Sequence, residues 1–456
     1  MVDWVFNERD WKIWNDGWIQ EVYGGWFRVY AFTMTLGVIA AILFSAYKFW
    51  RKDLQLTQLA IGAVPIVICS LFGASFFGKL NSGGKTDFSN PSEVWRLFQF
   101  WQGGMAIHGG VFVGAFVGII IFYFMGRRTH VSVWTYMDAI IPNILIGQGI
   151  GRWGNFFNHE ITGPPIGLAS ETNLWWLPNF ITRNTQAVYI GLNNKPPING
   201  IHLENGQLYQ LNPIFIYEAF WLIVAWAVIT FVIPHFLKWF QKRPENISMS
   251  KLNVELKNEY FNTFANALGE FQFTNFGGWK YDRLFYFNIS SYGMKNYDSV
   301  KSRLDKSRSN KEIGYLSYRW KMGQALEEAN NPYRIKVIRS GVEAGAYFFS
   351  WNLVRFILEL QRPSNHLFIQ NDKTLSLIVI GITGLIGLIV MALCQFVVPY
   401  LFRKTGYSYE KDYFKVINLK NVESINPEVA NKKNNVRKSK EIKAQEKLEK
   451  LKQKAK

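Results

Sequence analysis

The chain has 456 residues, of which 49% are hydrophobic and 17% aromatic, and its formal net charge is +18. Its two cysteines, Cys69 and Cys394, lie in separate apolar runs, which excludes a disulfide framework and indicates two small buried side chains. The six histidines include no pair at i, i+4 spacing, so we expect no zinc site.

Long apolar runs alternate with lysine-rich stretches, which is typical of a polytopic membrane protein with soluble additions. Residues 403–456 contain 16 Lys and Arg against 7 Asp and Glu, which accounts for about half of the net charge. Basic charge beside a membrane usually faces the cytoplasm and its anionic lipid. We therefore expect this tail at the inner membrane face, and we expect no nucleic-acid partner.

Residues 1–28 are polar but contain Trp4, Trp11, Trp14 and Trp18, whose spacing places them on one helical face. This pattern predicts either an interfacial helix among the lipid headgroups or a folded cap on the outer surface. A cleavable signal peptide does not fit, because the apolar run that follows begins late and is too long.

Seven apolar stretches are long enough to cross the hydrocarbon core, which takes about 20 residues of helix. They predict an all-α polytopic membrane protein with seven transmembrane helices. The fourth and sixth stretches carry polar residues and would fail a strict hydropathy threshold. The seven stretches are 29–49, 57–78, 106–125, 133–151, 213–234, 342–360 and 374–401.

Basic residues follow the first, third, fifth and seventh stretches. All four basic ends lie on one side if the count is seven, which favours an outer N-terminus and a cytoplasmic C-terminus. The predicted organisation is an outer interfacial segment (1–28), five transmembrane helices with outer loops (29–240), a cytoplasmic insertion (241–340), two further helices (341–402) and the basic tail (403–456).

The insertion is rich in Phe, Tyr, Asn and Gly, which is enough apolar content for a small soluble domain, but it has no recognisable motif. Our hypothesis is that its basic, aromatic surface docks on the inner leaflet or on a cytoplasmic partner. No internal repeat is evident in the sequence, which argues against an inverted-repeat transporter.

Four polar residues follow the fourth stretch within the sequence GQGIGRWGNFFNHEITG: Arg152, Asn155, Asn158 and Glu160. Ionisable residues at bilayer depth are costly, so they are functional candidates. The arginine suits a phosphate or carboxylate ligand, and the alternative is an interfacial arginine that reaches the headgroups. The GxGxxG spelling here lacks the preceding strand that a dinucleotide site requires.

His108 opens the third stretch from the outside, between the glycine pairs Gly103-Gly104 and Gly109-Gly110. Histidine has an unperturbed pKa that suits proton transfer near neutral pH. Glycine neighbours allow a bulky ligand or another backbone to approach. A lone histidine is more often structural, but this setting favours a catalytic role.

Arg355, Glu359 and Arg362 stand at i, i+4 and i+7, so one face of the sixth stretch carries alternating charge. Two arginines beside a bilayer require a polar cavity, unless the stripe is an ion pair that holds the bundle in register. A surplus of arginine predicts an anionic ligand, and a cavity open to lipid predicts a phospholipid headgroup. Further groups that could neutralise the arginines are Asp138, Tyr217 and Glu218.

Residues 151–163 match without a gap the pattern G-R-x-G-N-F-x-N-x-E-x-x-G, and the chain therefore resembles the prolipoprotein diacylglyceryl transferase family. Residues 101–110 are similar to the family's W-x-G-G-M-x-x-H-G-G, and residues 355–362 to its arginine-glutamate-arginine helix. Arg28-Val29-Tyr30 is similar to its early Trp/Arg-x-Tyr. Asn212 stands where the family has the histidine of H-P-x-x-x-Y-E, which argues against an essential role for that position.

The resemblance implies transfer of the sn-1,2-diacylglyceryl group of phosphatidylglycerol to the lipobox cysteine of a prolipoprotein signal peptide. This reaction is the first step of bacterial lipoprotein maturation. It forms a thioether and releases glycerol phosphate, without a metal or organic cofactor. The implied location is the bacterial plasma membrane, with the site toward the outer leaflet and membrane lipids around it.

The resemblance also assigns roles to residues. Arg152 and Arg355 would stabilise the charge that builds on phosphate, and His108 would take the thiol proton. The residues expected to bind or position substrate, together with Arg152, are Tyr30, Gly109, Gly110, Asp138, Asn155, Asn158, Glu160, Gly163, Tyr217, Glu218, Glu359 and Arg362.

Two other functions remain open from the residues alone. A lipid transporter or scramblase could use the same arginines to pass an anionic headgroup without forming a covalent product. An intramembrane peptidase would need a Ser–His or paired-Asp arrangement within the apolar stretches, and neither is visible in the sequence.

Deletion of residues 246–335 should leave lipidation of a lipobox peptide intact, because the resemblance does not extend to the insertion. Mass spectrometry of the peptide after incubation with the purified deletion variant measures this. Loss of activity in a correctly folded variant would contradict the expectation.

Overall fold

The computed structural model describes residues 6, 9–14, 19–52, 54–81, 89–102, 105–160, 162–192, 196–240, 291–330, 336–369, 372–403, 407 and 409. The chain forms two compact units. The first comprises residues 1–236, 264–273 and 338–396, and the second comprises residues 237–263, 274–337 and 397–456. Each unit is described by itself.

Within the described residues, five helices are long and apolar enough to cross a membrane, as judged by length and composition. Each contains an apolar window of 18 residues with at most two charged residues. The fourth continues from α8 (Ile214–Ala227) through a π-helical turn (Val228–Val232) into α9 (Ile233–Trp239). The other four are α1 (Val29–Arg51), α2 (Leu56–Asn81), α4 (Ile107–Thr129) and α14 (Lys373–Phe396).

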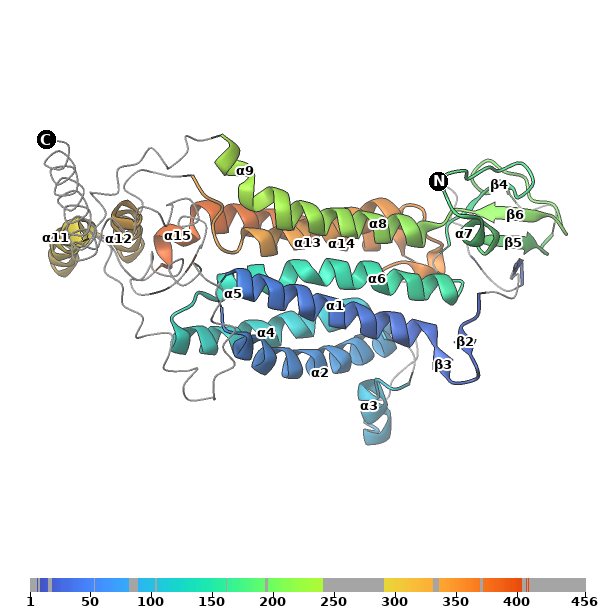
Figure 1. Ribbon diagram of the computed structural model, residues 1–456, viewed down its shortest axis with the longest axis horizontal. Helices are drawn as coiled ribbons and strands as arrows, with labels where there is room; N and C mark the ends of the chain where they lie inside the picture. The colour runs from blue at the N-terminus through green and yellow to red at the C-terminus, as the bar shows by residue number, and fades with distance from the viewer. Residues whose placement is uncertain are drawn as a thin grey trace, which may run out of the picture. The chain divides into compact units, whose positions relative to one another are not determined.

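The two stretches with polar residues differ from these five. The stretch at 133–151 is broken into α5 (Val133–Ile140), a 3-10 turn and α6 (Ile144–Phe157), because Pro142 cannot continue an α-helical hydrogen-bond ladder. The other becomes α13 (Val342–Glu359), which contains three charged residues within 18. Figure 1 shows α6 and α13 as parts of the helical bundle, where α6 packs against α1 and α8 and α13 packs against α14 and α8.

Glycine allows the closest helix contacts in the bundle. A Cβ on Gly147 of α6 would lie 2.7 Å from the carbonyl oxygen of Gly37 on α1, and a Cβ on Gly37 would lie 2.5 Å from that of Gly147. The contact of α4 with α2 is similar, since a Cβ on Gly109 would lie 2.5 Å from the carbonyl oxygen of Gly73. Small residues at membrane helix interfaces let backbones approach in this way.

The polar end of the first unit contains a small antiparallel sheet, so the fold is mostly helical rather than all-α. Its order is β1-β5-β6-β4. The sheet was not predicted from the sequence, because its strands are short and separated by long connections. Its strands are β1 (Trp11–Ile13), β4 (Pro165–Leu168), β5 (Gln186–Tyr189) and β6 (Leu208–Leu211), with α7 (Asn179–Arg183) between β4 and β5 and the hairpin β2 (Val22–Tyr23) and β3 (Phe27–Arg28) before α1.

The predicted interfacial helix over the N-terminal tryptophans is wrong in the described part. Trp11 lies in a strand paired with β5, is 3% exposed and packs edge-on against Tyr189 and Tyr209. These contacts correspond to the alternative prediction of a folded cap. Trp4 and Trp18 lie outside the described residues.

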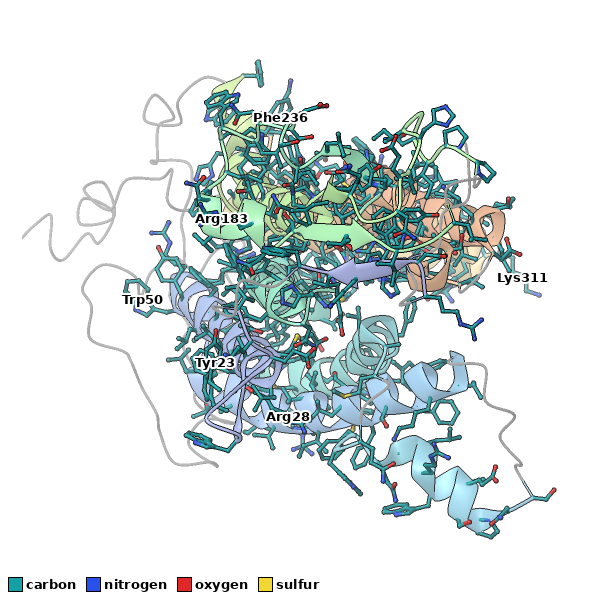
Figure 2. The ribbon with its side chains drawn as sticks, turned by 90° about the vertical axis from the view of Figure 1, so that its right-hand side faces the viewer. Tyr23, Arg28, Trp50, Arg183, Phe236 and Lys311 are labelled. Atoms are coloured by element: carbon teal, nitrogen blue, oxygen red, sulfur yellow. The ribbon has the colours of Figure 1, made fainter. Side chains whose placement is uncertain are left out.

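The C-terminal end of α1 and the N-terminal end of α13 are joined by ion pairs far from the sheet. Asp138 of α5 accepts hydrogen bonds from the backbone N–H groups of Gly341 (2.7 Å) and Ala344 (2.9 Å), and so caps the first turn of α13. Glu343 pairs with Lys48 at 2.8 Å and with Lys52 at 3.4 Å. These contacts fix the position of α13 along α1, the helix whose last turn holds Trp50 (Figure 2).

Part of the predicted insertion belongs to the second unit as the helices α11 (Ser291–Ser309) and α12 (Tyr315–Asn330). The guanidinium group of Arg319 donates to the carbonyl of Leu401 in α15 (Val398–Leu401) through Nε (3.0 Å) and Nη2 (2.7 Å). Residues 241–290 and almost all of the basic tail lie outside the described residues.

A shorter helix of the first unit, α3 (Pro91–Phe98), is capped by Asn90.

Gly147→Ala should lower the stability of the bundle, because its Cβ would meet backbone rather than a flexible side chain. Overpacking of this kind costs about 1–3 kcal/mol. Thermal unfolding in detergent measures the loss. Gly381→Ala is the matched control, since its Cβ would lie 3.8 Å from Phe356 in ordinary contact. Equal unfolding temperatures for the two variants would show that α1 and α6 are not packed as described.

Candidate active site

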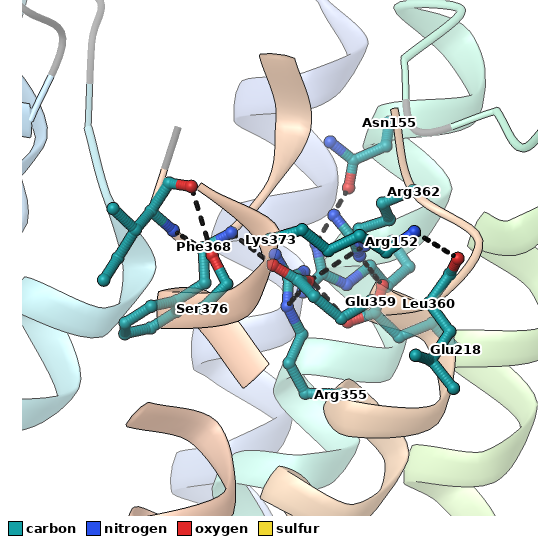
Figure 3. A network of polar contacts seen from close by, with 11 residues as sticks. Arg152, Asn155, Glu218, Arg355, Glu359, Leu360, Arg362, Phe368, Lys373 and Ser376 are labelled. Atoms are coloured by element: carbon teal, nitrogen blue, oxygen red, sulfur yellow. Dashed lines mark hydrogen bonds and ion pairs between the residues drawn. The ribbon is translucent and has the colours of Figure 1, made fainter. Parts of the chain in front are cut away.

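Three helices bring charged side chains together near one end of the bundle. Arg152 lies in the second half of α6, Glu218 in the second turn of α8, and Arg355 and Glu359 in the last two turns of α13. Arg362 follows α13 directly. Figure 3 shows these five side chains pointing toward one another from separate segments of the chain.

Glu218 is the centre of this arginine cluster. Its side chain is 1% exposed, and its Oε1 lies 2.8 Å from Nη2 of Arg152 and 3.9 Å from Nη1 of Arg355. Its other oxygen, Oε2, accepts a 2.5 Å hydrogen bond from Nη2 of Arg362. One carboxylate therefore contacts three guanidinium groups, of which two are on or beside α13 and one is on α6.

Glu359 is the second carboxylate of the cluster, and its side chain is fully buried. Its Oε2 lies 2.8 Å from Nε of Arg355 and 3.9 Å from Nε of Arg362. Its Oε1 accepts a short hydrogen bond from the backbone N–H of Phe368. Glu359 therefore orients Arg355 and also holds the loop that follows α13.

Three arginines face two glutamates here, so the cluster has one formal positive charge in excess. Buried charges are stable only when paired. Nε of Arg152 is buried and has no hydrogen-bond partner in the described part of the chain. An excess of charge and an unused donor are what a bound anion requires.

A chain of amide contacts leads from the buried arginine to the surface. Nη1 of Arg152 donates to Oδ1 of Asn155 at 3.4 Å, and Nδ2 of Asn155 donates to Oε2 of Glu160 at 3.1 Å. Nδ2 of Asn158 donates to the other oxygen of Glu160 at 3.4 Å. The four polar residues that follow the fourth apolar stretch therefore form one hydrogen-bonded path at the end of α6.

The remaining predicted residues border this cluster or lie apart from it. Tyr30 packs on Gly154 at the crossing of α1 and α6, where a Cβ would lie 2.9 Å from the tyrosine ring. Tyr217 stacks on Trp176, with ring centroids 5.6 Å apart. The N–H of Gly163 donates to the carbonyl oxygen of Asn212 at 2.7 Å.

Asn212 links that loop to the segment after α13. Its Nδ2 donates to Oε1 of Gln361 at 2.7 Å. The residue that replaces the family's histidine therefore has a structural partner next to the arginine cluster.

Asp138 does not join the arginines, and the expectation that it neutralises them is wrong. Its carboxylate is 2% exposed and caps α13 at the opposite end of the helix from Arg355. Gly109 and Gly110 lie where α4 packs on α2, so the close approach that they allow is that of another backbone.

His108 lies in the first turn of α4, but its side chain is outside the described residues, as are Gly103 and Gly104. Its role as proton acceptor stays a prediction.

Two further histidines carry signals of function that were not predicted, His366 near Arg355 and Arg362, and His159 next to Glu160. Both ring nitrogens of His159 and Nδ1 of His366 are buried without a hydrogen-bond partner in the described part. The sequence signal for His159 was its place in the motif between Asn158 and Glu160. Its left-handed backbone, with φ of 50°, could be seen only in the structure. The only signal for His366 was its distance of four residues from Arg362.

Together, the helices and the cluster define a membrane protein whose bundle contains a buried, arginine-rich site suited to an anion. A model of the prolipoprotein diacylglyceryl transferase family matches residues 21–250, half of the chain. The chain belongs to this family. The matched range includes Arg152 and Glu218, and the structure brings Arg355, Glu359 and Arg362 to them from outside it.

Curated relatives agree with this assignment. The phosphatidylglycerol–prolipoprotein diacylglyceryl transferase of Mycoplasmoides gallisepticum is 33% identical over 232 residues, which is 45% of this chain and 56% of the relative. The protein of the same name from Staphylococcus xylosus is 37% identical over 146 residues, 32% of this chain and 43% of the relative. That from Oceanobacillus iheyensis is 32% identical over 203 residues, 43% of this chain and 60% of the relative. The matches thus span about half the length of these relatives.

Glu218→Ala should destabilise the protein strongly, because it leaves Arg152 and Arg362 buried without their nearest carboxylate. Removing one partner of a buried ion pair costs about 3–5 kcal/mol. Thermal unfolding in detergent checks this, with the exposed Glu204→Ala as control, for which a change within about 0.5 kcal/mol is expected. A similar unfolding temperature for both variants would show that Glu218 does not hold the cluster together.

Proposed function

We propose that this chain transfers the sn-1,2-diacylglyceryl group of phosphatidylglycerol to the lipobox cysteine thiol of a prolipoprotein signal peptide. The observation that carries the proposal is the buried cluster of three arginines around Glu218, with its excess of positive charge. Family membership and the names of the curated relatives support the same activity.

The reaction is a displacement at carbon. The thiolate sulfur attacks the sn-3 carbon of the diacylglyceryl group, the carbon–oxygen bond to phosphate breaks, and the electron pair leaves with the phosphate oxygen. The products are a thioether and glycerol phosphate. Negative charge on phosphate rises during this step, so catalysis requires fixed positive charge at the leaving group.

The cluster is organised to supply that charge. Arg152 and Arg355 are the arginines that we assign to the phosphate, and Glu218 and Glu359 keep their guanidinium groups in place. Electrostatic attraction is stronger in a buried site than in water. Because the donors are already oriented, little reorganisation is needed as charge develops.

The thiol must lose its proton before attack, since free cysteine is mostly protonated at neutral pH. We assign that proton to His108, on the family motif at residues 101–110. Tyr30, Asn155 and Glu160 border the arginine cluster or connect to it, and they are the groups that we assign to substrate positioning.

We also propose seven membrane spans, an outer N-terminus and a site toward the outer leaflet of the bacterial plasma membrane. The five long apolar helices support this, together with the packing of α6 and α13 inside the same bundle. The basic residues Arg51 and Lys52 at the end of α1, and Arg127 and Arg128 at the end of α4, support the orientation.

The test is mass spectrometry of a lipobox peptide incubated with purified protein and phosphatidylglycerol. A diacylglyceryl mass gain on the cysteine is expected, and Arg152→Ala should reduce its rate by about 100-fold or more. Arg152→Lys keeps the charge beside Glu218 but loses the planar fork, so an intermediate rate is expected.

Arg183→Ala is the matched control, because this arginine is exposed on α7, the short helix between strands β4 and β5. Its rate should equal that of the wild type. No mass gain with folded wild-type protein would contradict the proposal, and lipid movement in reconstituted vesicles would then favour a transporter or scramblase.

A further inference from the structure

The loop between α13 and α14 folds back onto the arginine cluster. The N–H of Phe368 donates to Glu359. Nζ of Lys373 donates to the carbonyl of Leu360 at 2.9 Å, and Ser376 exchanges hydrogen bonds with both backbone groups of Ile369 at 2.8 Å and 3.1 Å. Figure 3 shows these contacts beside the arginines. The loop is therefore held in place at the edge of the cluster.

His366 ends a 3-10 turn (Ser364–His366) in this loop, and its own N–H donates to Pro363 at 2.9 Å. The Nδ1 atom of its ring is buried and has no hydrogen-bond partner in the described part of the chain. A buried polar atom without a partner is unfavourable and uncommon in folded proteins. An atom in this state beside a proposed ligand site is a candidate contact for the ligand.

The surroundings keep this imidazole neutral. Burial lowers the pKa of His366, and the positive charges of Arg362 and Arg355 lower it further. The other charged groups of the cluster are Glu359 on α13, Glu218 on α8 and Arg152 on α6. A neutral imidazole carries one donor and one acceptor, so one ring nitrogen of His366 has a free lone pair.

The cluster otherwise consists of donors and of carboxylates that arginines already engage. Phosphate oxygens accept hydrogen bonds and match the arginines. A hydroxyl group on the same ligand donates, and therefore needs an acceptor. In the described residues, Nδ1 of His366 is a buried ring nitrogen without a partner, and it is such an acceptor in the tautomer that carries its proton on Nε2.

We propose that Nδ1 of His366 accepts a hydrogen bond from a headgroup hydroxyl and so makes the arginine cluster selective for anionic phospholipids whose headgroup bears a hydroxyl. This inference rests on the proposed function and deepens it, because it assigns the part of the substrate that is released with the phosphate. His366 is a specificity-determining residue rather than the base, since positive neighbours make it a weak acceptor of the thiol proton.

The experiment compares two lipids in mixed micelles with the purified full chain. Phosphatidylglycerol bears hydroxyls on its headgroup, and phosphatidylpropanol has the same phosphodiester charge without a hydroxyl. The readout is kcat/KM for peptide lipidation with each lipid. A site that hydrogen-bonds a substrate hydroxyl rejects the analogue that lacks it, so the wild type should prefer phosphatidylglycerol by about tenfold or more.

His366→Phe should bring this ratio close to one while activity with phosphatidylpropanol is retained. His366→Leu is a second apolar variant in case the larger ring perturbs the loop, and thermal unfolding identifies whichever of the two is folded. His366→Asn retains an acceptor oxygen and should keep part of the preference. His202→Phe replaces an exposed histidine between strands β5 and β6 and should leave the ratio of kcat/KM for the two lipids unchanged.

Equal losses with both lipids in a folded His366→Phe or His366→Leu variant would overturn the inference, because a merely structural role lowers both rates together. An unchanged ratio would overturn it as well. These outcomes leave the proposed function standing, whereas no lipidation by the wild type with phosphatidylglycerol would remove the proposed function itself.

Discussion

Glu218 lies where α6, α8 and α13 meet, and its buried carboxylate contacts three guanidinium groups. In an apolar bundle this contact is a requirement, because buried charges are tolerated only when they are paired. The helices that carry its partners are also held by contacts away from the cluster. Helix α6 follows a break and packs closely on α1 through glycine, and α13 is capped at its first turn by Asp138.

The local chemistry of this site could be predicted from the sequence. The i, i+4, i+7 spacing indicated that Arg355, Glu359 and Arg362 share a face, and the polar residues after α6 indicated a site at its end. Glu218 was expected among the groups that could neutralise the arginines, and its contacts confirm this, but its central position could not be predicted, because it depends on residues as many as 144 positions away. Asp138 was assigned to the wrong end of the bundle for the same reason, since its partners lie more than 200 residues further along the chain.

The helical part of the fold was easier to predict than the rest. Five apolar stretches gave the long helices because hydropathy alone determines them. The sheet was missed because β1 pairs with β5 across about 175 residues, so its pairing has no local signal. Two of the three helices that carry the site, α6 and α13, formed in the least apolar of the seven predicted stretches. Their polar residues lower the hydropathy of both stretches, and packing against α1, α8 and α14 buries most of those residues.

Helix α13 carries a charged group near each end, Glu343 beside the lysines of α1 and Glu359 within the arginine cluster. Sixteen residues of α-helix separate them, a rise of about 24 Å, whereas the hydrocarbon core of a bilayer is about 30 Å thick. The two buried charged groups of this helix are therefore closer together than the two faces of a bilayer. A phosphate bound in the arginine cluster would thus lie below the level of the surrounding lipid headgroups.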